Sequence, residues 1–531
     1  TKYFLLSKDK IENECKQISI ALKNAPIVKN EKECAEQLRE IVKLRYLEYK
    51  TLETNPEYLL RANRHICDSD HGALATRFTV QYNLYSGSIV ALGNEIQRQR
   101  LYDTQDKAEL GCFAFTEIGA GVLSGAGVET TAEYDPIKKI FIINSPTPTS
   151  SKTWISQGMY AEHAVILANL IMPDGKDEKD RNKGPHLFFT RIQNRNEITG
   201  DLTPINNSIK LTSLPQKTAL WGLDNAYIQF DHFEVPRTDL LSKFSYVNED
   251  GVYELNLPSG NKRMLDLLLS RLLTGRVCLS EYTIGVARSI LQTSYQYAST
   301  RELWQSSKQK ASGAPKDLMS EKPLILNAFI NYSESLAIVA HFIAHTREKV
   351  GECIRNSLFP AHVIEAVCIC KFVGTSFGVD SVSAIRKLLG SRALLDESRL
   401  GPSSFVCNAT CAAEGDNTIM ELKILGDLFK GGMKSIFPKE LIINSLKRSQ
   451  TRILVIRYIL LVLWAMILGK SAFNDGQLLR DIAWCRANLI ILNVWFTNPP
   501  KYDEDYKQKD LDRMVESYDH ILMKYPTPVC H

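Results

Sequence analysis

The stretch GCFAFTEIGAGVLSGAGVETTAEYD, residues 111–135, gathers residue types that could build a cofactor site. It combines Thr116 and Glu117 with glycines at 111, 119, 121, 125 and 127. Such a loop can cradle a phosphate with backbone amides, clamp a flat cofactor or simply turn the chain. These glycines precede a turn and a strand rather than a crossover helix. A dinucleotide-binding Rossmann motif therefore has little support.

A second candidate for chemistry is Glu414, in the segment AEGDNTIM of residues 413–420. It follows Ala412 and Ala413, small apolar neighbours that would leave its carboxylate poorly hydrated. Poor hydration raises the pKa of a carboxyl group toward neutrality, which suits a base that removes a weakly acidic proton. The alternative interpretation is a glutamate that caps the helix DNTIMELKILGDLFK.

Composition narrows the classes of protein to consider. The chain has 531 residues, of which 44% are hydrophobic and 23% charged, as is typical of a soluble globular protein with several domains. A net charge of +4 is small for this length and does not favour a partner nucleic acid. The 12 cysteines include no C-x-x-C pair, so we expect buried free thiols and no metal site.

The pattern of apolar, β-branched and turn residues changes three times along the sequence and predicts an α+β protein. Apolar residues at three- and four-residue spacing indicate helices before residue 110. Short β-branched and aromatic runs, such as KIFIIN and HLFFTRI, then indicate a β-barrel or β-sandwich. Long helical patterns follow and favour a four-helix bundle. The predicted domains are an N-terminal helical domain (1–110), a β domain (111–250), a helical bundle (262–440) and a C-terminal helical region (441–531).

The run ILVIRYILLVLWAMILG, residues 453–469, is almost wholly apolar. It is barely long enough to span a bilayer, and it contains Arg457. We expect a helix buried on most sides. A helix that contacts a membrane or a larger complex through 453–469 is the alternative.

Four sequence blocks resemble, in order, those of the acyl-CoA oxidases, which belong to the acyl-CoA dehydrogenase superfamily. The blocks are DHGALATRFTVQYNLYSGSIVALG (70–93), GCFAFTEIGAG (111–121), INSPTPTSSKTWISQG (143–158) and AEGDNTIM (413–420). They lie on the order of helices, strands and helices that the residue pattern indicates. The resemblance implies an acyl-CoA dehydrogenase-like fold, in which a helical region is added to the four-helix bundle.

The resemblance also implies a reaction. The chain would be an FAD-dependent oxidase that converts fatty acyl-CoA to trans-2-enoyl-CoA while O₂ is reduced to H₂O₂. Glu414 matches the catalytic base of the family, a glutamate directly before a glycine.

Other site residues follow from the same resemblance. Residues of the glycine-rich block, of the 143–158 block and of YASTRELW match the FAD-binding positions: Thr116, Gly121, Trp154, Ser156 and Arg301. Arg301 would reach the FAD of a neighbouring subunit, which implies a homodimer with shared FAD sites. Arg276 and Ser124 would contact the substrate. Taken alone, these positions also fit a strand-end threonine, a core tryptophan and a solvated arginine.

Two departures from the family pattern motivate a second hypothesis. Val122 and Leu123 stand where a polar contact is expected, with Ser124 as a partial replacement. The segment LLGSRALL (388–395) keeps only Gly390 of a glycine-rich turn. These changes and the apolar 453–469 run motivate the alternative of a catalytically reduced paralogue that serves as a structural or assembly subunit of a larger mitochondrial complex, whereas the retained Glu414, Thr116 and Trp154 argue against it.

The resemblance implies a peroxisomal location. The sequence ends in YPTPVCH rather than in an S-K-L signal, so a mitochondrial location is the alternative.

Overall fold

A computed structural model of the chain describes most of its residues. The described residues are 28, 30–67, 72–121, 127–260, 263–301, 313, 323–468, 472, 475–499, 514 and 518. Ser124, with the two apolar residues before it, lies outside them.

The N-terminal part of the chain folds as helices, as the spacing of its apolar residues predicts. The last helix of this part begins with a capping box, in which Asn94 and Gln97 satisfy each other's backbone N–H groups. These helices are α2 (Glu31–Leu44), α3 (Thr51–Thr54), α4 (Glu57–Cys67), α5 (Gly72–Thr79), the π-helix η2 (Val80–Ser86), α6 (Gly87–Leu92) and α7 (Glu95–Asp106).

A six-stranded sheet follows, with β5 at its centre. Strands β1 and β2 pair with β5 in parallel, one after the other, and β6 pairs with it antiparallel. Strand β3 then joins β2 to β11. The strands are β1 (Gly111–Ala114), β2 (Thr131–Asp135), β3 (Ile140–Asn144), β5 (His163–Ile171), β6 (Asn182–Arg191) and β11 (Phe233–Pro236).

A second, antiparallel sheet has the order β4–β10–β9. Its strands are β4 (Lys152–Ser156), β9 (Ile209–Ser213) and β10 (Asn225–Phe230). The short pairs β7 (Gln193–Arg195) with β8 (Leu202–Pro204) and β12 (Ser245–Val247) with β13 (Tyr253–Leu255) lie beside the two sheets, as does the short helix α8 (Glu178–Arg181).

The β5 strand shows why this region is a layered β structure. Its alternate residues belong to two different cores. Val165 and Leu167 pack with the helices, whereas Ile166 and Ala168 pack with residues of the second sheet such as Ile228. Period-two alternation with both faces buried is what a sheet between two layers requires.

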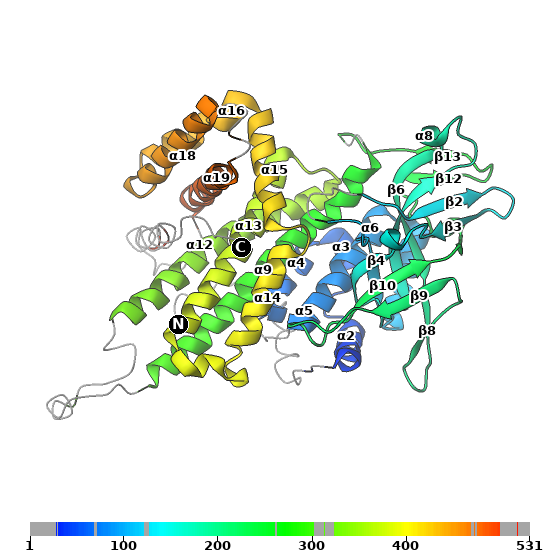
Figure 1. Cartoon of the computed structure of the whole chain (residues 1–531), viewed down its shortest axis with the longest axis horizontal. Helices are drawn as coiled ribbons and strands as arrows, with labels where there is room; N and C mark the ends of the chain where they lie inside the picture. Colours follow the sequence, from blue (N-terminus) through cyan, green and yellow to red (C-terminus); the bar gives the residue numbers. More distant parts are fainter. Residues whose placement is uncertain are drawn as a thin grey trace.

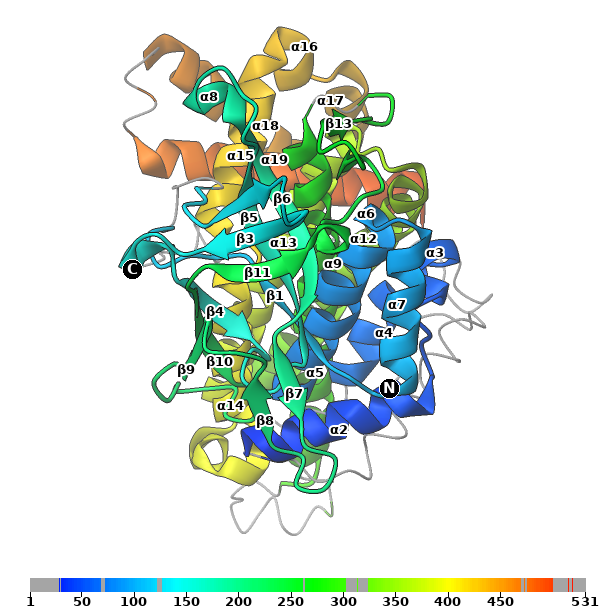
Figure 2. The same cartoon turned by 90° about the vertical axis from the view of Figure 1, so that its right-hand side faces the viewer.

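The helical bundle follows the β region and lies beside it (Figures 1 and 2). Its helix α9 runs for 36 residues without interruption. The helices are α9 (Met264–Ser299), α12 (Pro323–Asn356), α13 (Ala361–Leu388), α14 (Leu400–Ala412) and α15 (Asn417–Lys430). Two 3₁₀ turns, η5 (Gly390–Leu394) and η6 (Asp396–Ser398), connect α13 to α14.

The C-terminal helices pack on the side of the bundle that faces away from the sheets (Figure 1). They are α16 (Gly432–Ile436), α17 (Lys439–Leu446), α18 (Ser449–Leu468) and α19 (Gly476–Thr497), and α18 and α19 share a separate hydrophobic core with α15. The predicted α+β fold class is confirmed. The predicted boundaries of the four domains stay a prediction.

Candidate active site

Glu414 lies in the turn between α14 and α15 and has an unusual backbone. Its φ is 57°, and that of Gly415 is 94°. Glutamate rarely adopts a left-handed conformation, and such strain is commonly found at functional sites. The turn holds this one side chain toward α9.

The Glu414 carboxyl group lies against Gly275 of α9. A Cβ atom at position 275 would come within 2.5 Å of Glu414 Oε1. Glu414 Oε2 is buried and accepts no hydrogen bond from the described residues. Burial therefore raises the pKa of Glu414 to about 7, although the charges of Arg276 and Lys371 oppose the rise. The carboxyl group is poised to exchange a proton near neutral pH.

The predicted cause of this pKa shift needs correction. Ala412 and Ala413 are both exposed, so they do not form the dry slot. The slot is formed on α9, where the absence of a side chain at Gly275 admits the carboxyl group. The interpretation of Glu414 as a helix cap is also wrong. Asp416 is the N-cap of α15, and its side chain accepts a hydrogen bond from the Thr418 N–H.

Arg276 lies next to Glu414, as expected if both residues belong to one site. Its Nε donates a hydrogen bond of 3.1 Å to the Glu414 carbonyl. The guanidinium group thus fixes the backbone of the turn, while its charge lowers the pKa of the carboxyl group.

Lys371 of α13 is a site residue that sequence reasoning missed. Its buried Nζ donates to the carbonyl of Cys411, at the end of α14, and to Asn417 Oδ1 at 2.8 Å, at the start of α15. It therefore holds both ends of the Glu414 turn. Burial lowers its pKa to about 8. The only signal in the sequence was a single lysine inside the apolar run AVCICKFVG.

Thr116, Trp154 and Ser156 lie together at the edge of the second sheet. The Thr153 N–H donates to the Thr116 carbonyl at 2.8 Å, which joins the segment after β1 to β4. Asn225 Nδ2 donates to the Trp154 carbonyl at 3.3 Å and to Ser156 Oγ at 3.0 Å. Asn225 was not among the predicted site residues.

Trp154 is not a core aromatic residue. It is 61% exposed, and its φ is 57°. A large apolar side chain that is exposed and lies on a strained backbone indicates a binding surface rather than a packing contact in the core. Thr116 is exposed beside it. The interpretation of Trp154 as a buried packing residue is therefore wrong.

Glu117 anchors the loop that carries Thr116. Its carboxylate accepts hydrogen bonds from the Glu129 N–H, from the N–H and hydroxyl of Thr130, and from the fully buried Lys152 Nζ at 2.7 Å. These donors lower the pKa of Glu117 although burial opposes them. Glu117 is therefore a structural group. Gly121, further along the loop, is exposed, and a Cβ atom there would meet no atom within 4 Å.

Arg301 lies far from Glu414 within one chain. It is exposed just beyond the end of α9, about 37 Å along the helix from Arg276. Its guanidinium carbon lies 5.5 Å from the ring centroid of Tyr297, and that of Arg392 lies 5.2 Å from the same centroid. Arg392 also pairs with Glu397. Of the predicted site residues, Arg276 and Glu414 form one group and Thr116, Trp154 and Ser156 another, whereas Arg301 joins neither.

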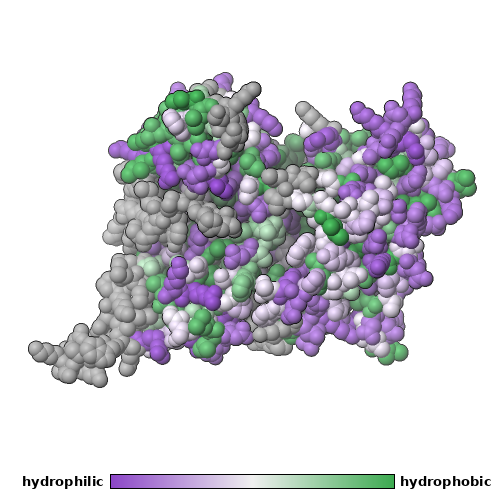
Figure 3. All heavy atoms as spheres, in the orientation of Figure 1, coloured by the Kyte–Doolittle hydropathy of each residue, from purple (hydrophilic) through white to green (hydrophobic). Residues whose placement is uncertain are grey.

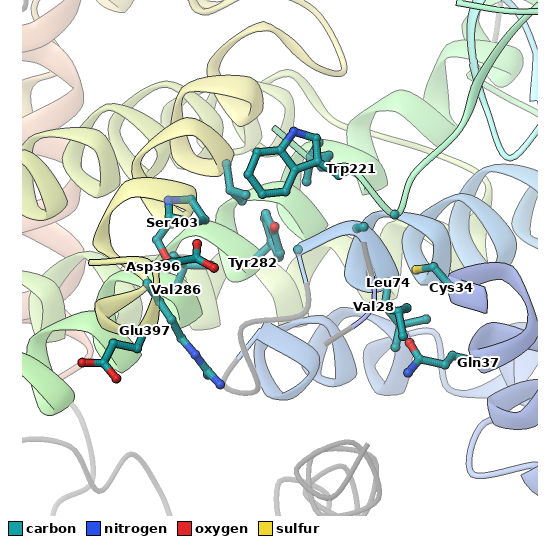
Figure 4. Close-up of a pocket in the computed structure, with 17 residues that line it drawn as sticks. Val28, Cys34, Gln37, Leu74, Trp221, Tyr282, Val286, Asp396, Glu397 and Ser403 are labelled. Carbon is teal, nitrogen blue, oxygen red and sulfur yellow. The ribbon is translucent and has the colours of Figure 1, made fainter. Parts of the chain in front are cut away.

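A cavity of about 350 Å³ opens where the loop before β10 meets α2, α5, α9 and α14. Figure 4 shows Trp221 and Tyr282 among the residues that line it. Its apolar lining includes Leu74, Leu220, Val286 and Val406. Tyr282 is seven residues beyond Gly275 on α9, or about 10 Å along the helix axis. The cavity therefore lies along the two helices that carry and face the Glu414 turn.

The sequence and the fold of this chain were compared with those of known proteins. No family model matches the chain. A peroxisomal acyl-coenzyme A oxidase 2 of Arabidopsis thaliana is 27% identical over 364 residues, which are 67% of this chain and 51% of that protein. The chain thus spans about half the length of the curated relatives it matches.

Solved structures resemble nearly the whole chain. Acyl-CoA oxidase 1 of Arabidopsis thaliana has a TM-score of 0.71 at 20% identity, covering 96% of this chain and 81% of that one. Acyl-CoA oxidase-2 of Caenorhabditis elegans, bound with FAD, ascaroside-CoA and ATP, has a TM-score of 0.70 at 16% identity, with coverage of 97% and 84%. Glutaryl-CoA dehydrogenase of Mycobacterium smegmatis has a TM-score of 0.61 at 18% identity, with coverage of 80% and 96%.

The chain therefore has the fold of the acyl-CoA dehydrogenase superfamily. Within that class, its relatives by sequence are acyl-CoA oxidases. The resemblance drawn from the four sequence blocks is confirmed.

Proposed function

We propose that this protein is an FAD-dependent acyl-CoA oxidase that removes hydrogen from the α and β carbons of a fatty acyl-CoA. The products are trans-2-enoyl-CoA and H₂O₂. The observation that carries the proposal is the Glu414 carboxyl group, which is buried against Gly275 and has a pKa of about 7. Its Oε2 accepts no hydrogen bond from the residues that the structure describes. The peroxisomal acyl-CoA oxidases among its relatives support a peroxisomal location.

The residues of the second sheet edge fit a flavin. They offer an exposed indole at Trp154 and the hydroxyl of Ser156, both on β4, and an exposed Thr116 on the segment that is hydrogen-bonded to β4. A flat ring needs an aromatic surface and nearby hydrogen-bonding groups, and this edge supplies both. The C. elegans oxidase with the same fold was solved with FAD. Bound FAD would accept the hydride from the β carbon.

The residues of this chain would perform the proton transfer. Glu414 removes the α proton, for which a pKa near neutrality is well matched. Arg276 holds the turn through the Glu414 carbonyl, and Lys371 holds both of its ends. The Glu414 N–H donates no hydrogen bond within the described residues, so it is available to polarise the thioester carbonyl.

We further propose that the cavity beside α9 and α14 receives the distal part of the acyl chain. It lies about 10 to 16 Å along α9 from Gly275, between Tyr282 and Val286. The substitution Val406→Trp fills this cavity. It should lower kcat/KM for long acyl-CoA by about 10- to 200-fold and leave short acyl-CoA unaffected. Equal loss for both substrates would exclude this part of the proposal.

A spectrum of the purified protein tests the main proposal. The protein should show flavin absorbance, lose it when acyl-CoA is added without oxygen, and form H₂O₂ in air. A colourless protein that takes up no added FAD would contradict the proposal.

One observation favours a second candidate function, a catalytically reduced paralogue in a larger mitochondrial assembly. In the 390–394 turn, Arg392 covers Tyr297 and pairs with Glu397, so side chains occupy the region where the family has glycines. This candidate predicts the colourless protein just described, together with a stable hetero-oligomer in extracts.

A further inference from the structure

The helix α18 presents an exposed apolar face, which we name the outer face. Its exposed side chains recur every three or four residues, so that they line one side of the helix. They are Ile453, Ile456, Leu460, Leu463, Trp464, Met466 and Ile467. Figure 3 shows hydrophobic atoms gathered over the region of α18. A continuous apolar surface of this kind is unusual on a soluble protein and marks an interaction site.

The opposite face of α18 already has a partner. Val455, Tyr458, Val462 and Ala465 are buried in the core that α18 shares with α19. A helix that is apolar on every side is normally buried on every side. In the part of the chain that the structure describes, only one side of α18 is covered, so the expectation of a helix buried on most sides is wrong.

The packing on α19 determines how α18 could meet a membrane. The segment Thr451–Leu468 is apolar and long enough to span one, but only 28% of it is buried, whereas the similar segment of α13 is 72% buried. A spanning helix would have to leave α19 and carry Arg457, which lies 3.9 Å from Asp481, into the bilayer. The geometry fits a helix that lies flat on a surface instead.

The charges around the outer face fit an anionic surface. Lys447 and Arg452 are exposed at its N-terminal end. No charged residue follows Arg457 within α18. Trp464 is exposed on the face, and tryptophan favours the boundary between lipid and water. An apolar helix face with basic residues beside it is the pattern of helices that bind anionic lipid surfaces.

We propose that the outer face of α18 docks the protein onto the surface of an anionic lipid bilayer, with the helix axis parallel to that surface. A protein partner is less well matched, because the face offers few hydrogen-bonding groups and interfaces between proteins normally carry several. The inference goes beyond the proposed oxidase activity and does not depend on Glu414.

Vesicle co-sedimentation of the full chain tests the proposal. The protein should bind vesicles of phosphatidylcholine and phosphatidylserine, bind pure phosphatidylcholine more weakly, and release with added salt. The double variant Leu460→Glu/Ile467→Glu should lose at least about 10-fold in binding, because the charges would enter the apolar layer. The matched control is Ile137→Glu/Ile198→Glu, two β-domain residues that are 92% and 95% exposed.

Three results would overturn the proposal. The wild-type protein could fail to bind the anionic vesicles, or the α18 variant could bind as well as the control. As a third result, neither the wild-type protein nor the variants would bind vesicles, and the α18 variant would convert a dimer into a monomer. That result would assign the outer face to a second copy of the chain. Circular dichroism verifies that both variants stay folded, since all four positions are exposed.

Discussion

Glu414 combines two features that a protein normally avoids, a left-handed backbone and a buried carboxyl oxygen with no hydrogen-bond donor among the described residues. Both are unfavourable for folding, and both are explained if the carboxylate must meet a substrate proton. We therefore infer that Glu414 lowers the stability of the folded protein and is present for its role in the reaction. The loss of stability can be measured.

The substitution Glu414→Gln should stabilise the protein at neutral and alkaline pH. The pKa of Glu414 is about 7 when folded, against an ordinary value of 4.5, so the folded state resists ionisation. The wild-type penalty is absent below pH 4.5, grows between 4.5 and 7, and is complete above 7. Urea unfolding at pH 8 should show a gain of about 1–3 kcal/mol. An equal gain at every pH would refute the assigned pKa.

Gly275 is the residue that makes room for the base. The substitution Gly275→Ala would place Cβ 2.5 Å from Glu414 Oε1, so the carboxyl group must move. Steady-state kinetics should show a loss of about 10²-fold in kcat with flavin retained. The control is Gly426→Ala in α15, where a Cβ meets no atom within 4 Å and should only favour the helix. Unchanged kcat in the Gly275 variant would contradict the proposed position of the base.

At the scale of elements, Lys371 and Arg276 tie the Glu414 turn to α13 and α9. Both also lower the pKa of Glu414 through their charge. Lys371→Met should therefore raise that pKa and shift the rising limb of the kcat/KM profile to higher pH by roughly half a unit to one unit. Lys423→Met, which removes an exposed lysine paired with Asp427 of α15, is the control. A purely structural Lys371 would lower activity without moving the profile.

Sequence reasoning succeeded where information was local. Periodicity and turn residues predicted the order of helices, sheets and bundle. Sequence reasoning missed Gly275, Asn225 and Lys371, because each acts on a residue at least 40 positions away along the chain. Packing between distant elements leaves no periodic signal. For the same reason, the dry slot was wrongly assigned to Ala412 and Ala413.

At the scale of the whole molecule, Arg301 raises the question of assembly. Its place beyond the far end of α9 separates it from Glu414 within one chain, so an FAD site that used both residues would need two subunits. The homodimer with shared sites stays a prediction, and it can be tested without a structure of the complex.

Mixed dimers of two inactive variants test the sharing of sites. In a dimer of Glu414→Gln with Arg301→Ala, one site would combine an intact Glu414 with an intact Arg301 from the other subunit. Random assembly makes half of the dimers mixed, and each mixed dimer has one intact site of two, so co-expression should restore roughly a quarter of the wild-type activity if the sites are shared. If Arg301 serves its own subunit, the mixture should stay as inactive as its parents. Gel filtration of each variant verifies that dimers form.

The central claim is that Glu414 removes the α proton, and anaerobic reduction of the bound flavin by a fatty acyl-CoA tests it most directly. The control is Glu421→Gln, because burial also raises the pKa of Glu421, in α15, to about 7. The Glu414→Gln variant should bind flavin but slow its reduction by roughly 10²- to 10⁴-fold, whereas Glu421→Gln should keep nearly the wild-type rate. Flavin reduction by Glu414→Gln at the wild-type rate would contradict the claim.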